Sequence, residues 1–165
     1  MIKDRAIDLL IATVNRVVNY EMMFSILAER LLLQVIQHSN KYTFQNFNTT
    51  DYCNLIKCMD IIMSASADIK AIADDSETLV LGNVVVFCNQ GDVSSALAES
   101  SKLNLAAISN EDIFLTLSHH VCIALSAEGN VDSAVEYLTT TVLKMSLRRE
   151  SQSPFRLAPF NKLTK

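Results

Sequence analysis

Residues 91–97 read GDVSSAL and residues 129–135 read GNVDSAV, so one seven-residue pattern occurs twice, 38 residues apart. In each copy an apolar run precedes the Gly, and an Asp or Asn and a second helix-forming run follow it. A Gly can end a helix in a left-handed conformation, and the short side chain after it accepts hydrogen bonds from the first amides of the next helix. The pattern therefore predicts two helical hairpins between Leu79 and Leu143.

A small residue follows each turn at the same distance. Ala96 and Ala134 lie five residues after Gly91 and Gly129, where a small side chain lets the two helices of a hairpin approach closely. This arrangement resembles the tetratricopeptide repeat, although the period here is 38 residues and that family's is about 34. The resemblance implies that the two glycines form the turns and the two alanines the close helix contacts.

A tetratricopeptide-like hairpin pair also implies a function. Helical repeats of this kind hold another protein on their concave side. By the resemblance, the residues on that side would be Thr116, His119, Ile123 and Ser126. The chain is therefore predicted to be a non-catalytic scaffold or adaptor that binds a peptide or a helical segment of another protein.

The composition favours helix along most of the chain. Among 165 residues there are three Gly and two Pro, and both Pro lie after residue 153, so helix breakers are almost absent before that point. We predict an all-α fold, a helical bundle or short α-solenoid of about six to seven helices. A single domain would span residues 1–147, with N-terminal helices in 1–73 and the two hairpins in 79–147.

The N-terminal third carries apolar residues at three- and four-residue spacing. This spacing predicts helix over residues 3–18 and 20–38, and one long helix or a pair bent near Asn19 fits equally well. Residues 40–50 are predicted to form a connecting loop. Residues 7–36 carry more large apolar side chains than one buried face needs, so a homodimer through them, in an architectural role, is the alternative to the scaffold.

Helix signals continue through the middle of the chain. A third helix is predicted to begin with Thr50 or Asp51 as its cap and to run to about Ala73. Residues 79–88 are apolar on nearly every face, which predicts the most buried helix of the domain. A further helix over 113–128, capped by Ser109 or Asn110, and a last one from 131 to about 147 complete the pattern.

Charge is distributed unevenly. Residues 1–143 carry 8 basic and 17 acidic side chains, a net charge of −9, whereas residues 144–165 have a net charge of +5. An acidic body argues against direct nucleic-acid binding. Residues 148–165, which include both Pro, are predicted to be a basic and flexible tail.

The tail contains a short motif. Residues 155–159 read FRLAP, which has the form F-x-L-x-P and is similar to peptides that telomere-repeat-factor homology domains bind. The similarity implies partner contacts by Phe155, Leu157 and Pro159 within a chromosome- or telomere-associated complex. The alternative is that these side chains fold back onto the bundle.

No pattern of catalytic chemistry emerges. The four Cys have no paired metal spacing, and adjacent His119 and His120 would point about 100° apart on a helix, so a packing or groove role is favoured over a metal site. We therefore predict no enzyme, metal or cofactor. Unpaired thiols and the lack of a long apolar span predict an intracellular protein, cytoplasmic or nuclear, without a membrane-spanning segment.

Overall fold

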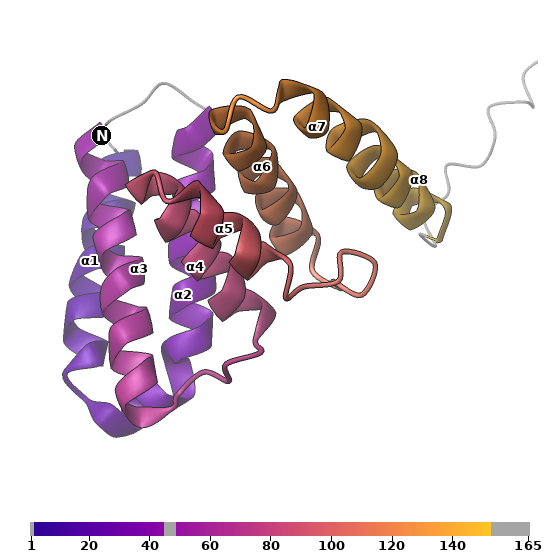
Figure 1. Cartoon of the computed structure of the whole chain (residues 1–165). Coiled ribbons are helices and arrows are strands. Elements are labelled where there is room, and N and C mark those ends of the chain that lie inside the picture. Colours follow the sequence, from indigo (N-terminus) through magenta and orange to yellow (C-terminus); the bar gives the residue numbers. More distant parts are fainter. Residues whose placement is uncertain (1, 45–48, 153–165) are drawn as a thin grey trace, which may run out of the picture.

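Three long helices form one side of the molecule. The computed structural model describes the backbone of residues 2–44 and 49–152, and the side chains of residues 5–40 and 49–148. In it α1 (Ile2–Val18), α2 (Glu21–Phe44) and α3 (Thr49–Ile69) pack against one another (Figure 1). All regular structure in the described backbone is helical, which confirms the all-α prediction.

The helix boundaries answer the questions that the sequence left open. The first segment is a helix pair, because α1 ends at Val18 and α2 begins at Glu21. The predicted loop over 40–50 is partly wrong: α2 continues to Phe44, since no Gly or Pro stops it earlier. Residues 45–48 of that loop lie outside the described residues.

The third helix ends four residues before the predicted Ala73. Lys70 adopts a left-handed conformation with φ of 51°, so the helix stops at Ile69. The buried Ser66 holds this end, because its carbonyl accepts from Ala71 N (3.1 Å) and its hydroxyl from Ile72 N (2.9 Å). No Gly or Pro marks this stop in the sequence.

Most apolar side chains of residues 7–36 pack in the hydrophobic core of the chain itself. The buried ones form one core with α3 and α4; in this range they are Ile7, Leu10, Val14, Val17, Phe24, Ala28, Leu31, Leu32, Val35 and Ile36. Met23 and Ile26 follow the apolar spacing that predicted the second helix, but they are exposed in the structure. Ile26 lines a surface hollow together with Ser76 and Ile113.

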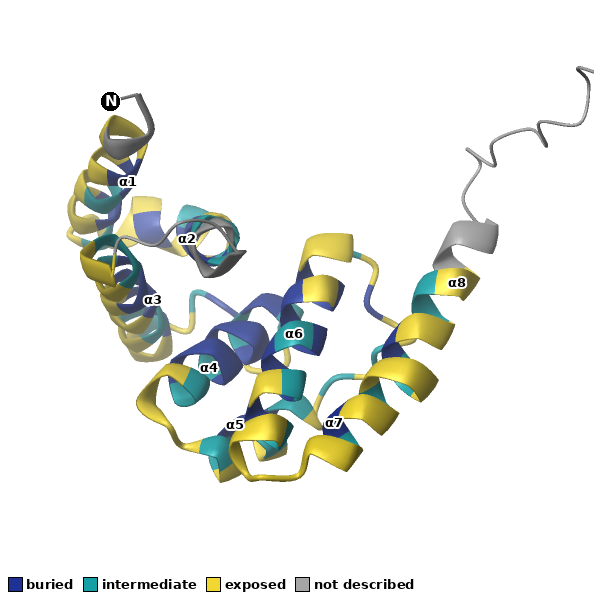
Figure 2. Cartoon of the chain, turned by 90° about the horizontal axis from the view of Figure 1, so that it is seen from above, coloured by how far each residue is buried: buried dark blue, intermediate teal, exposed yellow. Residues whose placement is uncertain are grey.

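The fourth helix occupies the centre of the molecule. α4 (Glu77–Gln90) packs against α2, α3, α5 (Val93–Ser100) and α6 (Glu111–Ala127), and it is buried on nearly every face (Figure 2). This confirms the prediction that residues 79–88 form the most buried helix. Neighbours on several sides explain why its sequence shows no polar face.

The two predicted turns have the same hydrogen bonds. Gly91 and Gly129 have φ of 76° and 77°. The amide of Gly91 donates to the carbonyl three residues before it, and the next amide donates to the carbonyl five residues before its own position. Both bonds recur at Gly129. The side chains of Asp92 and Asn130 each accept from an amide three residues later, at 3.2 Å in both cases. The repeated sequence pattern therefore corresponds to two similar helical hairpins, α4–α5 and α6–α7 (Val131–Glu136).

The last predicted helix is continuous but not uniform. α7 passes into a π-helical stretch, η1 (Tyr137–Val142), and then into α8 (Leu143–Gln152). The hydroxyls of Thr139 and Thr140 donate to carbonyls in the preceding turn, at 2.8 and 2.5 Å. These bonds occupy acceptors beside the wider turn, and such side-chain bonds to the backbone often bend a helix. Helix also extends through residue 152, five residues into the predicted tail.

Gly82 provides a test of the packing around α4. A Cβ atom added there would lie 2.9 Å from Met63 Sδ and 3.5 Å from Leu32 Cδ1. We expect Gly82→Ala to change the free energy of unfolding by about 1 kcal/mol or less, because the helix gains propensity while the flexible Met63 moves aside. Gly82→Leu should lower it by about 3 kcal/mol, since a large side chain overfills the junction. Urea denaturation measures both, and similar values for the two variants would contradict this packing.

Candidate protein-binding groove

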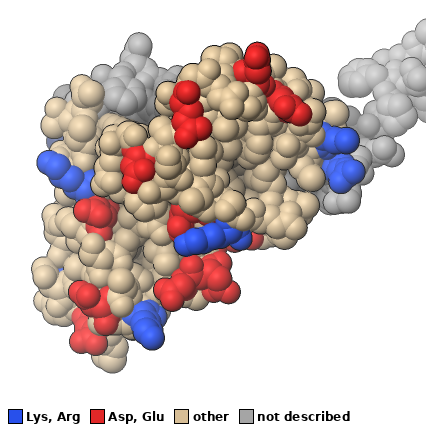
Figure 3. All heavy atoms as spheres, viewed as in Figure 1, with Lys and Arg blue, Asp and Glu red and all other residues tan. Residues whose placement is uncertain are grey.

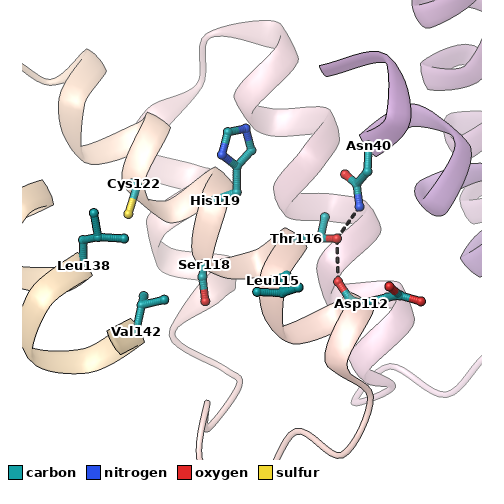
Figure 4. Close-up of a pocket in the computed structure, with 9 residues that line it drawn as sticks. All are labelled: Asn40, Asp112, Leu115, Thr116, Ser118, His119, Cys122, Leu138 and Val142. Carbon is teal, nitrogen blue, oxygen red and sulfur yellow. Dashed lines mark hydrogen bonds between the residues drawn. The ribbon is translucent and has the colours of Figure 1, made fainter. Parts of the chain in front are cut away.

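A pocket lies between α6 and the C-terminal helices. It has a volume of about 550 Å³. Its lining comes from α6, from η1 and from the C-terminal end of α2, and consists of Asn40, Asp112, Leu115, Thr116, Ser118, His119, Cys122, Leu138 and Val142 (Figure 4). The chain thus brings together segments that lie up to 102 residues apart in the sequence.

The start of α6 sets which of its side chains face the pocket. Asn110 caps this helix: its side chain accepts from Asp112 N at 2.9 Å and from Ile113 N at 3.3 Å. Of the two caps that the sequence allowed, Asn110 is the one used. Asp112, Thr116 and His119 then follow at four- and three-residue spacing, which places them along one side of the helix.

A chain of polar contacts joins α2 to α6 at one end of the pocket. Asn40 Nδ2 donates to Thr116 Oγ1, and that hydroxyl donates to the carbonyl of Asp112 at 2.6 Å. Gln37 Nε2 donates to Asp112 Oδ2 at 2.8 Å. Asn40 Oδ1 is buried and accepts no hydrogen bond within the described residues. A buried amide oxygen without a donor costs free energy.

The two histidines have different surroundings. His119 lines the pocket, whereas His120 is buried and its Nδ1 lies 2.8 Å from the carbonyl of Thr116. The rings meet edge to face, with centroids 5.4 Å apart. Burial lowers the pKa of both imidazoles, that of His120 to about 4. At neutral pH both rings are therefore uncharged.

The thiols near this site are held in their protonated form. Burial raises the pKa of Cys122, which lines the pocket, and raises that of Cys88 to about 11. A protonated thiol is a weak nucleophile and a poor metal ligand. Among the residues with described side chains, no three His, Cys, Asp or Glu lie together as a metal site would require.

The structure places the predicted groove residues in two groups. Thr116 and His119 line the pocket, but Thr116 is buried and hydrogen-bonded to Asn40. Ile123 and Ser126 lie further along α6 and outside the pocket lining; Ile123 is 39% exposed, and Ser126 Oγ donates to the carbonyl of Cys122. The tail residues predicted to bind a partner, Phe155, Leu157 and Pro159, lie outside the described residues.

Several lining residues were not predicted from the sequence. Leu138 and Val142 face the pocket from η1, where the π-helical turn changes the periodicity from which side-chain directions are predicted. Asn40 lies in the segment predicted as a loop, although it belongs to α2. Leu115 carried a usable signal, because it is an apolar residue on the polar side of an otherwise amphipathic helix.

Comparison with known proteins does not assign the chain to a family. No protein-family model matches the chain, and no curated protein or solved structure matches it significantly. The resemblance to the tetratricopeptide repeat therefore stays a prediction. In the described part of the chain, no helix is both long and apolar enough to span a membrane.

Proposed function

We propose that this chain is a non-catalytic scaffold or adaptor that binds a segment of another protein in the pocket between α6 and η1. The observation that carries the proposal is the pocket itself, which has apolar walls from Leu115, Leu138 and Val142 and a polar end at Asn40. Apolar walls with a few placed polar groups are typical of binding sites. The tetratricopeptide-like duplication supports the same class of function.

The pocket defines the chemistry of its ligand. One Leu-sized or Phe-sized side chain would fit between α6 and η1, where burial contributes about 2 kcal/mol. A polar group close to that side chain would meet the polar end of the pocket, which Asn40 and the exposed Asp112 form. A peptide or helical segment with an apolar anchor meets both requirements. The four cysteines form no disulfide, which suits a reducing compartment, so we propose that the chain acts in the cytoplasm or nucleus.

Site-specific photo-crosslinking tests the proposal in cells. A photoreactive amino acid at position 115 or 122 should capture the same polypeptide, because both positions line the pocket. The same amino acid at position 98, an exposed site on α5, serves as the control and should capture none of it. Different products from the two pocket positions, or one product from all three positions, would contradict a specific site.

Leu115→Asp should then weaken binding of the captured protein, measured by calorimetry with purified components. We expect its dissociation constant to rise about tenfold or more, because a carboxylate replaces an apolar wall of the pocket. Leu9→Asp is the matched control: Leu9 is 68% exposed on α1, outside the pocket lining. Circular dichroism verifies that both variants keep their helix content. Equal losses in the two variants would show that the pocket is not the site.

The corner between α1 and α2 supports a second candidate, self-association through residues 7–36. Tyr20, Met22 and Met23 are exposed there, and Ile26 is exposed one turn further along α2. Exposed apolar side chains that lie so close together in the sequence are candidates for contact with another protein. Light scattering of Met22→Asp across a concentration series tests this candidate: a dimer in the unmodified chain that the variant lacks would support it, and an unchanged mass would exclude it.

A further inference from the structure

The C-terminal helices carry a continuous apolar stripe that the described residues leave uncovered. Its members are Val131, Val135, Leu138, Leu143 and Leu147, and each is between 51% and 58% exposed. We call these five residues the C-terminal stripe. Figure 2 shows α7 and α8 at the edge of the molecule with exposed residues along their length. On the core side of the same helices, Ala134 and Val142 are buried. Leu138 borders both surfaces, because it belongs to the stripe and also lines the pocket.

The π-helical turn is what makes the stripe continuous. Leu138 and Leu143 lie five residues apart, which in an α-helix would turn them about 140° away from each other. In η1 the amide of Leu143 instead donates to the carbonyl of Leu138, so five residues complete about one turn. Val131 and Val135 before this turn therefore face the same side as Leu143 and Leu147 after it.

The first hairpin shows what ordinarily covers such a face. Val93 and Leu97 of α5 are the residues equivalent to Val131 and Val135, 38 positions earlier. They are half-buried, and α6 packs against α5. In the second hairpin the equivalent residues are exposed. The surface is thus of a kind that another helix covers in the same molecule.

Charged residues beside the stripe indicate which helix fits it. Each of Asp132, Glu136, Lys144 and Arg148 directly follows a stripe residue, so all four lie on one flank. All four are exposed. The acidic pair is in α7 and the basic pair in α8, and Figure 3 shows acidic side chains toward the α7 end and basic ones toward the α8 end.

We propose that a second copy of the chain covers the C-terminal stripe, with its own stripe running antiparallel. In an antiparallel helix pair each flank meets the same flank of the partner. The pairs 132 with 148 and 136 with 144 are both symmetric about residue 140. A twofold axis near Thr140 therefore places each acidic residue opposite a basic residue of the other copy, and every contact occurs twice.

Charge exchange in the full 165-residue chain tests this pairing. We compare the unmodified chain with two variants, one carrying Asp132→Lys and Glu136→Lys and the other carrying Lys144→Glu and Arg148→Glu. The unmodified chain should approach twice its 18.3 kDa mass as its concentration rises. Each variant alone would bring like charges together, so its dimer dissociation constant should rise about tenfold or more.

Mixing the two variants is the decisive measurement. The mixture places the lysines introduced at positions 132 and 136 of one variant opposite the glutamates introduced at positions 148 and 144 of the other. A heterodimer should therefore form with about the affinity of the unmodified dimer. A mixture that stays monomeric would overturn the antiparallel pairing. So would variants that dimerise as well as the unmodified chain, the result expected for a dimer through the α1–α2 corner. A chain that stays monomeric up to about 1 mM would overturn the proposal directly.

A change in the apolar stripe gives an independent measurement. Leu143→Asp should reduce dimerisation about tenfold or more, whereas Leu9→Asp, at another exposed leucine on α1, should leave it unchanged. Leu143 lies outside the pocket lining, so this variant should still bind a pocket ligand. Equal dimerisation by the two variants would overturn the role of the stripe. The result of this dimerisation test is therefore independent of the test of the proposed function, which depends on Leu115.

Discussion

Phe114→Ala is expected to lower the free energy of unfolding by about 3–5 kcal/mol, the largest effect of any single change described. Phe114 is 1% exposed and belongs to the core that α6 shares with α2, α3 and α4. Its removal leaves a cavity where the second hairpin meets the rest of the molecule. Denaturant unfolding followed by circular dichroism measures the change.

The adjacent residue on the same helix is the natural control. Leu115 is 50% exposed and points toward the pocket, so Leu115→Ala removes little buried surface and should cost about 1 kcal/mol or less. Both substitutions have similar effects on helix propensity, which leaves burial as the difference. Costs of similar size would show that α6 does not face the core as the structure has it.

Lowering the pH from 7.5 to 5 is expected to remove about 2 kcal/mol of stability through His120 alone. Burial lowers the pKa of this imidazole from 6.5 to about 4 in the folded chain. Between these two values the unfolded chain binds the proton more readily, so stability is full above about pH 6.5 and falls progressively toward pH 4. Unfolding by urea at a series of pH values measures the slope.

A variant that cannot titrate isolates this contribution. His120→Asn keeps an N–H near the position of Nδ1, where it can donate to the carbonyl of Thr116. Its absolute stability should be lower because of lost packing. Its stability should nevertheless change less between pH 7.5 and 5 than that of the unmodified chain, since other groups titrate alike in both. Parallel pH profiles would contradict the lowered pKa of His120.

The turns and the central helix were predictable because local signals decide them. At Gly91 and Gly129 the left-handed conformation and the cap that follows are properties of a few adjacent residues. The apolar run of α4 likewise implies neighbours on all sides, without identifying them. Helix content followed from the near absence of Gly and Pro, and this too is a local property.

The pocket was harder to predict because its parts meet only in the folded chain. Thr116 and His119 were placed on the groove side through the family resemblance, yet the walls opposite them come from η1. No propensity scale predicts a π-helical turn such as η1. The left-handed residue that ends α3 is Lys70, whereas the residue that usually indicates such a helix end is Gly. Asn40 reaches Thr116 only because α2 runs past the predicted loop boundary.

The one-sided packing of the C-terminal helices has a consequence for amide hydrogen exchange. Elements with few buried contacts open locally at a lower free energy than the core, so amides in η1 and α8 should exchange well before those of α4. Opening of these helices and global unfolding would then appear as two separate exchange regimes in one molecule. A partner bound at this edge would slow the first regime and leave the second almost unchanged, so binding is detectable even when the melting temperature does not move.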